Sequence, residues 1–365
     1  MSRPLVLKVG TSTLTAGGGG VEPARISALA AAIADLKGRG FDPVLVSSGA
    51  VAAGRQALGW PELPRQIPAK QMLAAVGQPL LIGQYQQALA EHGLTAAQIL
   101  LSRADLERRL SWLNARNTLR ALLDQGLIPV VNENDSVATE ELRFGDNDRL
   151  SALVATLVDA DKLLLLTDQD GLYSADPNRD PDAVLITEVV GAVPESLRSS
   201  AGESVSGVGT GGMASKLQAA DLARRASIGV IIANGAQLSR LPELLLGKGR
   251  GTYLHALGDR LEARKRFILG ALEGGSVTVD GGAAQALRQG RSLLPVGVRA
   301  LSGSFVRGDV IRVVDGSQVE LARGVANYSA DDLKRIAGLR SEEIEQRLGY
   351  HLGDVLIHRN DLVVV

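Results

Sequence analysis

The chain has 365 residues, of which 45% are hydrophobic, 22% charged and 3% aromatic. At roughly 100–200 residues per domain, this length predicts two domains, and the apolar fraction excludes a disordered or fibrous protein. The 39 Lys and Arg residues nearly balance the 40 Asp and Glu residues. The overall charge therefore does not favour a nucleic-acid or membrane-surface protein.

The chain contains no cysteine, which excludes disulfides, thiolate catalysis and thiolate-bound metal sites. The opening MSRPLVLKVG lacks the cationic and apolar regions of a signal peptide. No uncharged apolar stretch approaches the ~18 residues that span a bilayer. We therefore expect a soluble cytoplasmic protein without a membrane partner.

Strand and helix patterns alternate over the first 255 residues. Strands are predicted, in chain order, at residues 5–9, 43–46, 127–131, 162–166 and 229–232. Apolar residues at helical spacing fall between them, at residues 26–33, 106–113, 150–158 and 213–220. Ser102 and Asp105 form a capping-box pattern before the second of these helices. This alternation predicts an α/β fold with a mainly parallel sheet covered by helices on both faces.

The pattern changes near residue 255. A charge-dense stretch at 259–266 is followed by short strand patterns at 276–280, 297–301, 309–314 and 320–325, separated by glycine turns. Ser329 and Asp332 suggest a capped helix among them. We predict an α/β domain over residues 1–255, a linker over 256–273, and a small mainly-β domain with a tail over 274–365.

Polar residues follow the predicted strands where each strand ends. Lys8 lies at the end of the first strand and Gly10 and Thr11 follow it, while Ser47 and Ser48 follow the second. The third leads into the run 132–135, and the fourth into 167–168. Each cluster alone also fits ordinary turn or N-cap chemistry. Because ligands bind beyond the carboxyl ends of parallel strands, the four clusters together predict a ligand site.

The loop GVGTGGMASK at residues 207–216 contains the spacing G-x-G-x-x-G. No strand precedes it and no acidic residue follows about 20 positions later, so it does not indicate a dinucleotide site. Small residues at a helix start, with Lys216 in the first turn, suit an anion such as a phosphate. A mobile surface loop is the alternative.

The run Asp146-Asn147-Asp148 precedes a predicted helix. One aspartate fits an N-cap. The other could pair with a lysine, bind a metal through oxygen or meet an ammonium group, and the sequence does not choose among these.

The four histidines lie outside all of these clusters, which argues against a Ser-His-Asp triad or a histidine metal site. A reaction that needs no general base suits the chain better. Phosphoryl transfer to a carboxylate is one, because the acceptor is already ionised at neutral pH. Its catalysis consists of positioning together with stabilisation of phosphoryl charge by lysine and Mg²⁺.

The motifs LKVGTSTLT, VSSGAVAAG, PVVNENDSVA, FGDNDRLSA, LLLLTDQDGLYSADP and GVGTGGMASKLQAA closely resemble those of the amino-acid kinase family, in the expected order. The resemblance implies a three-layer αβα sandwich with a mainly parallel sheet. The motifs are most similar to those of members that use ATP and Mg²⁺ to convert L-glutamate to L-glutamyl 5-phosphate, the first step of proline biosynthesis. The segment SLLPVGVRALSGSFVRGDVIRV resembles a PUA domain.

The same resemblance implies roles for individual residues. Lys8 and Lys216 would contact the transferred phosphoryl group, with Asp148 holding both lysines. Ser48, Asp135 and Asn147 match positions that bind glutamate. The nucleotide site would comprise Lys8, Gly10, Thr11, Thr167, Asp168, Thr210, Gly211, Gly212, Met213, Ala214, Ser215 and Lys216. Mg²⁺ would be held mainly by the ATP phosphates. The resemblance also implies proline as an inhibitor and a homo-oligomer.

Two alternatives remain at this point. One is a kinase of the same family for another small carboxylate or phosphate acceptor, although Asp135 suits an acceptor with a free α-ammonium group. The other is an RNA-binding protein that acts through the PUA-like segment. Residues 274–365 contain eleven basic and eleven acidic residues. Because this balance lacks the positive charge that phosphate-backbone binding needs, we expect a structural or regulatory domain.

Overall fold

The computed structural model describes residues 3–15, 19–60, 62, 64, 66–137, 147–200, 212–258, 268–269 and 273–365. The chain divides into two compact units, Met1–Gly258 and Asp259–Val365. This division falls inside the stretch that the sequence analysis predicts as a linker, residues 256–273.

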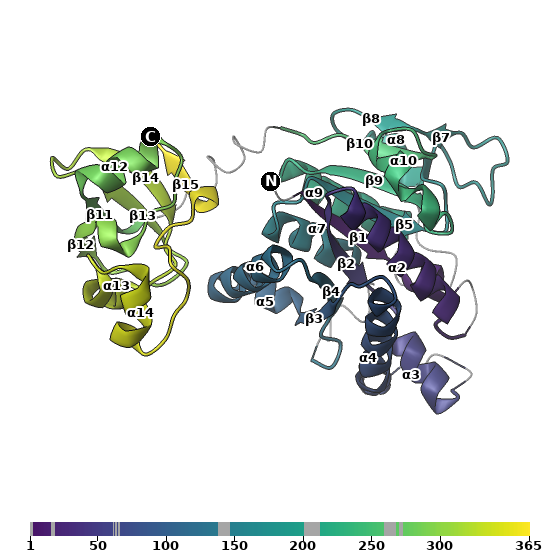
Figure 1. The fold of residues 1–365 in the computed structure, drawn as a ribbon. Coiled ribbons are helices and arrows are strands. Elements are labelled where there is room, and N and C mark those ends of the chain that lie inside the picture. Colours follow the sequence, from purple (N-terminus) through teal and green to yellow (C-terminus); the bar gives the residue numbers. More distant parts are fainter. Residues whose placement is uncertain are drawn as a thin grey trace. The chain divides into compact units, whose positions relative to one another are not determined.

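The first unit is built on an eight-stranded sheet with the order β3-β4-β2-β1-β5-β9-β10-β8 (Figure 1). Its pairings are parallel except for the antiparallel pair β9–β10. The mainly parallel sheet predicted from the sequence is thereby confirmed. The strands are β1 (Pro4–Val9), β2 (Asp42–Ser47), β3 (Ala96–Leu101), β4 (Ile128–Glu133), β5 (Lys162–Thr167), β8 (Glu188–Val189), β9 (Gly229–Asn234) and β10 (Gly251–Leu254).

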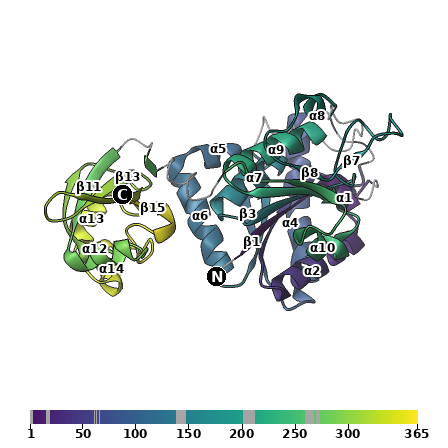
Figure 2. The ribbon, with the colours of Figure 1, turned by 90° about the horizontal axis from the view of Figure 1, so that it is seen from above.

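Helices cover both faces of this sheet (Figures 1 and 2). The elements packed on one face are α1 (Thr11–Thr15), α2 (Pro23–Gly38), α3 (Ala50–Leu58), α4 (Ile67–Ala90), η2 (Leu238–Arg240) and α10 (Leu241–Leu245). Those on the other are α5 (Arg103–Glu107), α6 (Arg109–Asp124), α7 (Asn147–Leu157), α8 (Glu195–Ser200) and α9 (Met213–Arg225). A small hairpin joins β6 (Leu172–Tyr173) to β7 (Leu185–Ile186).

The alternation of side chains along β1 determines the face of the sheet on which Lys8 lies. Leu5 and Leu7 enter the core under α2 and α4, whereas Val6 enters the core under α7 and α9. Since successive side chains of a strand point to opposite faces, Lys8 shares the face of Val6. The lysine therefore arrives beside α7 and α9 at the carboxyl end of the central strand.

One predicted helix differs from the structure. The capping box of Ser102 and Asp105 is present at the start of α5. The helix then stops, because Arg108 adopts an extended conformation (φ −86°, ψ 120°), and α6 begins at the next residue. This break takes Leu110 out of the expected apolar stripe and leaves it 51% exposed.

The second unit contains a five-stranded sheet with the order β12-β11-β13-β14-β15. Its four predicted strands and the helix capped by Ser329 and Asp332 are all present. The strands are β11 (Glu273–Val279), β12 (Val298–Gly303), β13 (Val310–Val314), β14 (Glu320–Val325) and β15 (Leu362–Val364). The helices are α12 (Gly281–Arg288), η3 (Pro295–Gly297), α13 (Ala330–Ile336), α14 (Ser341–Leu348) and η4 (Arg359–Asp361).

Candidate active site

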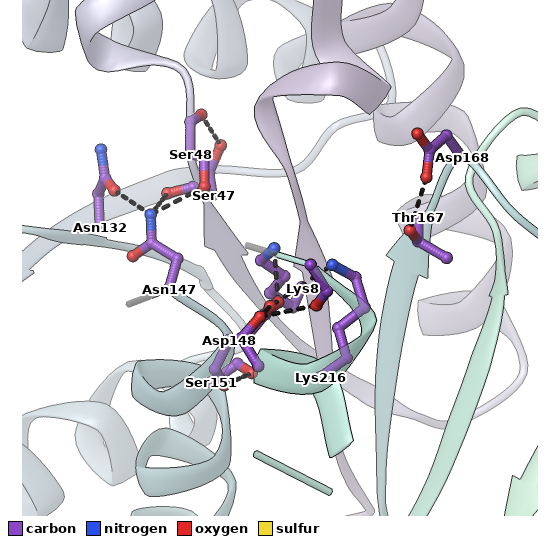
Figure 3. A network of polar contacts seen from close by, with 12 residues as sticks. Lys8, Ser47, Ser48, Asn132, Asn147, Asp148, Ser151, Thr167, Asp168 and Lys216 are labelled. Atoms are coloured by element: carbon purple, nitrogen blue, oxygen red, sulfur yellow. Dashed lines mark hydrogen bonds and ion pairs between the residues drawn. The ribbon is translucent and has the colours of Figure 1, made fainter. Parts of the chain in front are cut away.

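Two lysines meet one aspartate at the carboxyl edge of the large sheet (Figure 3). Lys8 comes from β1, Asp148 from the first turn of α7 and Lys216 from the first turn of α9. The Nζ of Lys8 lies 2.6 Å from Oδ1 of Asp148, and the Nζ of Lys216 lies 3.5 Å from its Oδ2. All three residues are at most 5% exposed. The aspartate therefore holds two buried ammonium groups beside each other.

The charges of this cluster shift its protonation equilibria. Burial alone raises the pKa of Asp148, but the charges of Lys8 and Lys216 outweigh burial and lower the pKa of this carboxyl. Burial lowers the pKa of Lys216, and the charge of Asp148 only partly opposes that shift. With both lysines protonated, two positive charges face one negative charge. The surplus positive charge suits an anionic ligand.

Hydrogen bonds hold Asp148 in this position. The hydroxyl of Ser215 donates to Oδ2 of Asp148 over 2.6 Å, and Ser151 donates to its backbone carbonyl over 2.5 Å. Of the roles that the sequence left open for an aspartate here, pairing with lysine is the one observed for Asp148. Asp146 lies outside the described residues.

A second polar group surrounds Asn147, the neighbour of Asp148 in the chain (Figure 3). Its Nδ2 donates to Oγ of Ser48 (2.9 Å), to the carbonyl of Ser47 (3.2 Å) and to Oδ1 of Asn132 (3.2 Å). Its own Oδ1 is buried and has no hydrogen-bond partner among the described residues. A buried acceptor without a donor favours a ligand that supplies an N–H or O–H group.

Three more of the predicted site residues, Asp135, Gly10 and Thr11, lie at the same edge of the sheet. Asp135 is half-buried in the turn that follows β4. Gly10 follows β1, and a Cβ placed on it would lie 3.4 Å from Nζ of Lys8. Thr11 opens α1 and is half-buried.

The predicted nucleotide residues occupy the end of β5 and the start of α9. Thr167 Oγ1 donates to Oδ1 of Asp168 over 3.0 Å. The charge of Asp168 also acts on Lys216. Gly212 is the N-cap of α9 and makes no side-chain cap. Met213, Ala214 and Ser215 follow in the first turn, half-buried, while Thr210 and Gly211 lie outside the described residues.

Two residues of α4 that the sequence did not indicate also contact the site. Gln78 Oε1 accepts a hydrogen bond of 2.7 Å from Nδ2 of Asn132, and the hydroxyl of Tyr85 lies 2.8 Å from Oγ of Ser47. Gln78 is one of five glutamines on α4 and Tyr85 is its single tyrosine, and their spacing matches no known motif. Only the fold brings them to the strand ends.

The described part of the chain contains no group of three or more His, Cys, Asp or Glu residues that could hold a metal ion. Nor does it contain a helix long and apolar enough to cross a membrane. The site thus offers concentrated positive charge with amide and hydroxyl groups beside it. Such groups can bind a phosphorylated ligand and stabilise negative charge on its phosphoryl oxygens.

The chain is similar to known proteins over its full length. The sequence profile of the amino acid kinase family matches residues 3–234, and that of the PUA domain matches residues 275–348. The glutamate 5-kinase of Shigella flexneri is 52% identical over 363 residues, which cover 99% of each chain. That of Yersinia enterocolitica is 52% identical over 364 residues, covering 100% of this chain and 99% of that protein.

Among solved structures, isopentenyl phosphate kinase is 19% identical, with a TM-score of 0.47, over 69% of this chain and 100% of that chain. This likeness is weak. The profile matches and the full-length relatives, in contrast, agree on one class of protein. The chain belongs to the amino acid kinase family, and a PUA domain follows its kinase domain.

Proposed function

We propose that this protein transfers the γ-phosphoryl group of ATP to the side-chain carboxylate of L-glutamate, forming L-glutamyl 5-phosphate for proline biosynthesis. The observation that carries the proposal is the cluster of Lys8, Asp148 and Lys216, which concentrates positive charge beside the amide and hydroxyl groups of Asn147 and Ser48. The full-length similarity to proteins named glutamate 5-kinase supports glutamate as the acceptor.

The reaction needs no general base. A γ-carboxylate oxygen of glutamate attacks the γ-phosphorus of ATP, so that one P–O bond forms while the bond to the leaving ADP breaks. The acceptor is already ionised at neutral pH, so no proton has to move. Lys8 and Lys216 neutralise charge on the transferred group, and Asp148 keeps both ammonium groups in place.

Ser48, Asp135 and Asn147 would bind the acceptor. The carboxylate of Asp135 and the unpaired Oδ1 of Asn147 are acceptors that suit an α-ammonium group. The hydroxyl of Ser48 suits a carboxylate. A phosphoryl acceptor without a free ammonium group would leave the buried Oδ1 of Asn147 without a donor, which favours glutamate over an N-acylated amino acid.

ATP would lie across the end of β5 and the start of α9. Gly10 and Thr11 would donate backbone N–H groups to its phosphates, as would the loop from Thr210 to Lys216. Thr167 and Asp168 would line the same site. Mg²⁺ would arrive bound mainly to the ATP phosphates, where it supplies further neutralisation of phosphoryl charge. The ammonium groups of Lys8 and Lys216, which lie together on Asp148, support this arrangement because they suit phosphate oxygens.

Proline as a competitive inhibitor and assembly with further copies are also part of the proposal. Met72 and Leu80, on α4, are 41% and 45% exposed, and Leu100 on the edge strand β3 is 38% exposed. These apolar side chains support a homo-oligomer.

ATP and glutamate as substrates favour a cytoplasmic location. For the domain at residues 274–365, its neutral charge supports a structural or regulatory role.

ADP release tests the proposal. The purified protein is supplied with ATP and Mg²⁺ and with glutamate, aspartate, N-acetylglutamate or UMP in turn, with and without proline. We expect turnover with glutamate and its suppression by proline. Turnover with another acceptor and none with glutamate would refute the assignment. Light scattering in the same buffer measures the oligomeric state.

A further inference from the structure

Helix α4 presents two polar side chains to the strand ends that carry the acceptor-binding residues. Gln78 and Tyr85 are seven residues apart, which places them on the same face of the helix, two turns from each other. We propose that these two are positioning residues, which hold Asn147 and Ser48 in the geometry that binds glutamate. This inference rests on the proposed function.

The first contact belongs to a chain of three amides. Asn147 Nδ2 donates to Asn132 Oδ1 over 3.2 Å, and Asn132 Nδ2 donates to Gln78 Oε1 over 2.7 Å (Figure 3 shows the Asn147–Asn132 step). The backbone N–H of Glu133 also donates to Asn132 Oδ1 over 2.9 Å. Because a backbone N–H needs an acceptor, it fixes which end of the Asn132 amide is oxygen.

The orientation of Asn132 has a consequence on each side. Its NH2 group must face Gln78, which therefore has to supply an acceptor. Its oxygen must face Asn147, which therefore turns its own NH2 group toward Asn132 and Ser48. The Oδ1 of Asn147 is left unpaired and buried. Gln78 thus sits at the end of a chain that keeps an acceptor available for an ammonium group.

The second contact supports Ser48 through its neighbour. Ser47 Oγ donates to the carbonyl of Ser48 over 2.8 Å, so its single proton is used, and the hydroxyl of Tyr85 must donate to Ser47. Burial raises the pKa of Tyr85, which keeps its hydroxyl protonated as a donor. Tyr85 therefore stabilises the turn from which the side chain of Ser48 reaches Asn147.

Both contacts come from one helix that is packed closely against its neighbour. A Cβ on Gly77 would lie 1.8 Å from the carbonyl oxygen of Ala50, so α4 approaches α3 to backbone contact. Gln78 follows directly. The two supporting side chains therefore have a fixed spacing, roughly 10 Å along the helix axis.

Kinetics of Gln78→Met and Gln78→Glu in the full-length protein test the inference. Methionine has a similar length, but its sulfur is only a weak acceptor for the hydrogen bond from Asn132 Nδ2. A glutamate carboxylate can accept this bond. We expect Gln78→Met to raise KM for glutamate roughly 3- to 10-fold, with KM for ATP unchanged. Gln78→Glu should stay closer to the wild type. Tyr85→Phe should shift KM in the same direction, and Gln87→Ala, at an exposed position of α4, is the control.

The outcomes distinguish failure of the proposed function from failure of the positioning role of Gln78 and Tyr85. A wild-type protein without glutamate-dependent ADP release refutes the proposed function, whatever the variants do. An active wild type, with Gln78→Met and Tyr85→Phe both matching Gln87→Ala in KM for glutamate, overturns the inference. Equal changes in both KM values and kcat would indicate a purely structural role and also overturn it. Should Gln78→Met fail to fold, Tyr85→Phe decides alone.

Discussion

Asp148 lies between Lys8 and Lys216 with only 1% of its surface exposed. A carboxylate in such a place is costly to desolvate, and so are the two ammonium groups. The three charges therefore depend on one another. Removing the aspartate would leave two like charges buried together, while removing one lysine would leave a balanced pair. The aspartate is for this reason the most sensitive of the three positions for stability.

For Asp148→Asn we expect the free energy of unfolding at neutral pH to fall by about 3–5 kcal/mol, because the buried lysines lose their counter-ion. Urea unfolding measures it. The control is Asp35→Asn, which removes the partner of Arg39 from an exposed helical pair and should change stability by less than about 1 kcal/mol. Equal losses in the two variants would contradict this account.

The lowered pKa of Lys216 predicts the pH dependence of kcat. In the proposed mechanism the protonated amine is the active form, so activity should be lost as pH rises through the lowered pKa. We expect an alkaline limb that begins below the range of an ordinary lysine. Lys216→Arg keeps its charge throughout and should lose this limb, even if its kcat is reduced. An alkaline limb unchanged in Lys216→Arg would assign the titration to another group.

Lys216→Ala should lower kcat by about 10²–10³-fold, because it removes a donor to the transferred phosphoryl group. We expect the variant to fold, since Lys8 and Asp148 still form a pair. The comparison is Lys248→Ala, at an exposed position in the first unit. Steady-state ADP release and circular dichroism measure both properties. Wild-type turnover in Lys216→Ala would remove this lysine from the mechanism.

At the scale of elements, the parts that bear the site differ in how visible they are in the sequence. β1 could be predicted because it is a short apolar run between polar residues. α7 and α9 could be predicted because their apolar residues follow a helical period, with polar residues in the first turn. α4 could not. Its 24 residues are apolar around most of the helix, with Pro79 inside, so no single stripe marks a face. The roles of Gln78 and Tyr85 depend on tertiary packing that the periodicity does not encode.

The contact between α3 and α4 gives a prediction for a helix pair. In Gly77→Ala the new Cβ would meet backbone atoms of Ala50 and Gly54. We expect the two helices to separate, stability to fall by about 1–3 kcal/mol or more, and KM for glutamate to rise as Gln78 moves. Gly83→Ala, on the same helix, has nothing within 4 Å of its Cβ and should gain about 0.5–1 kcal/mol. Similar behaviour of the two variants would contradict this.

At the scale of the whole molecule, the two units have separate hydrophobic cores. The large cores on the two faces of the first sheet contain residues of the first unit, and those of the second sheet contain residues of the second. The sequence showed the change from long α/β periods to short strands, because that change is local. The sequence did not indicate the edge strand β3, whose residues lack a clear polar alternation. Its two end residues are buried, and the four between them alternate between half-buried and exposed.

Separate cores predict that the first unit folds alone. We expect a chain of residues 1–258 to keep its circular dichroism signature and its KM for both substrates, as measured by ADP release. The full chain should show no RNA affinity beyond that of the truncated chain, because residues 274–365 carry no net charge. A truncated chain that is unfolded, or a salt-sensitive RNA affinity lost on truncation, would contradict these expectations.

Asn147 and Asp148 are consecutive residues in the first turn of α7, yet one faces the group around Ser48 and the other faces the two lysines. Their Cα atoms are separated by a single peptide unit, about 3.8 Å. If the protein has the proposed function, the first turn of this helix sets the distance between the glutamate site and the phosphoryl site. Folding of the chain fixes the distance between the two sites. Two bound reactants would therefore lose less entropy in reaching each other, which raises their effective concentration.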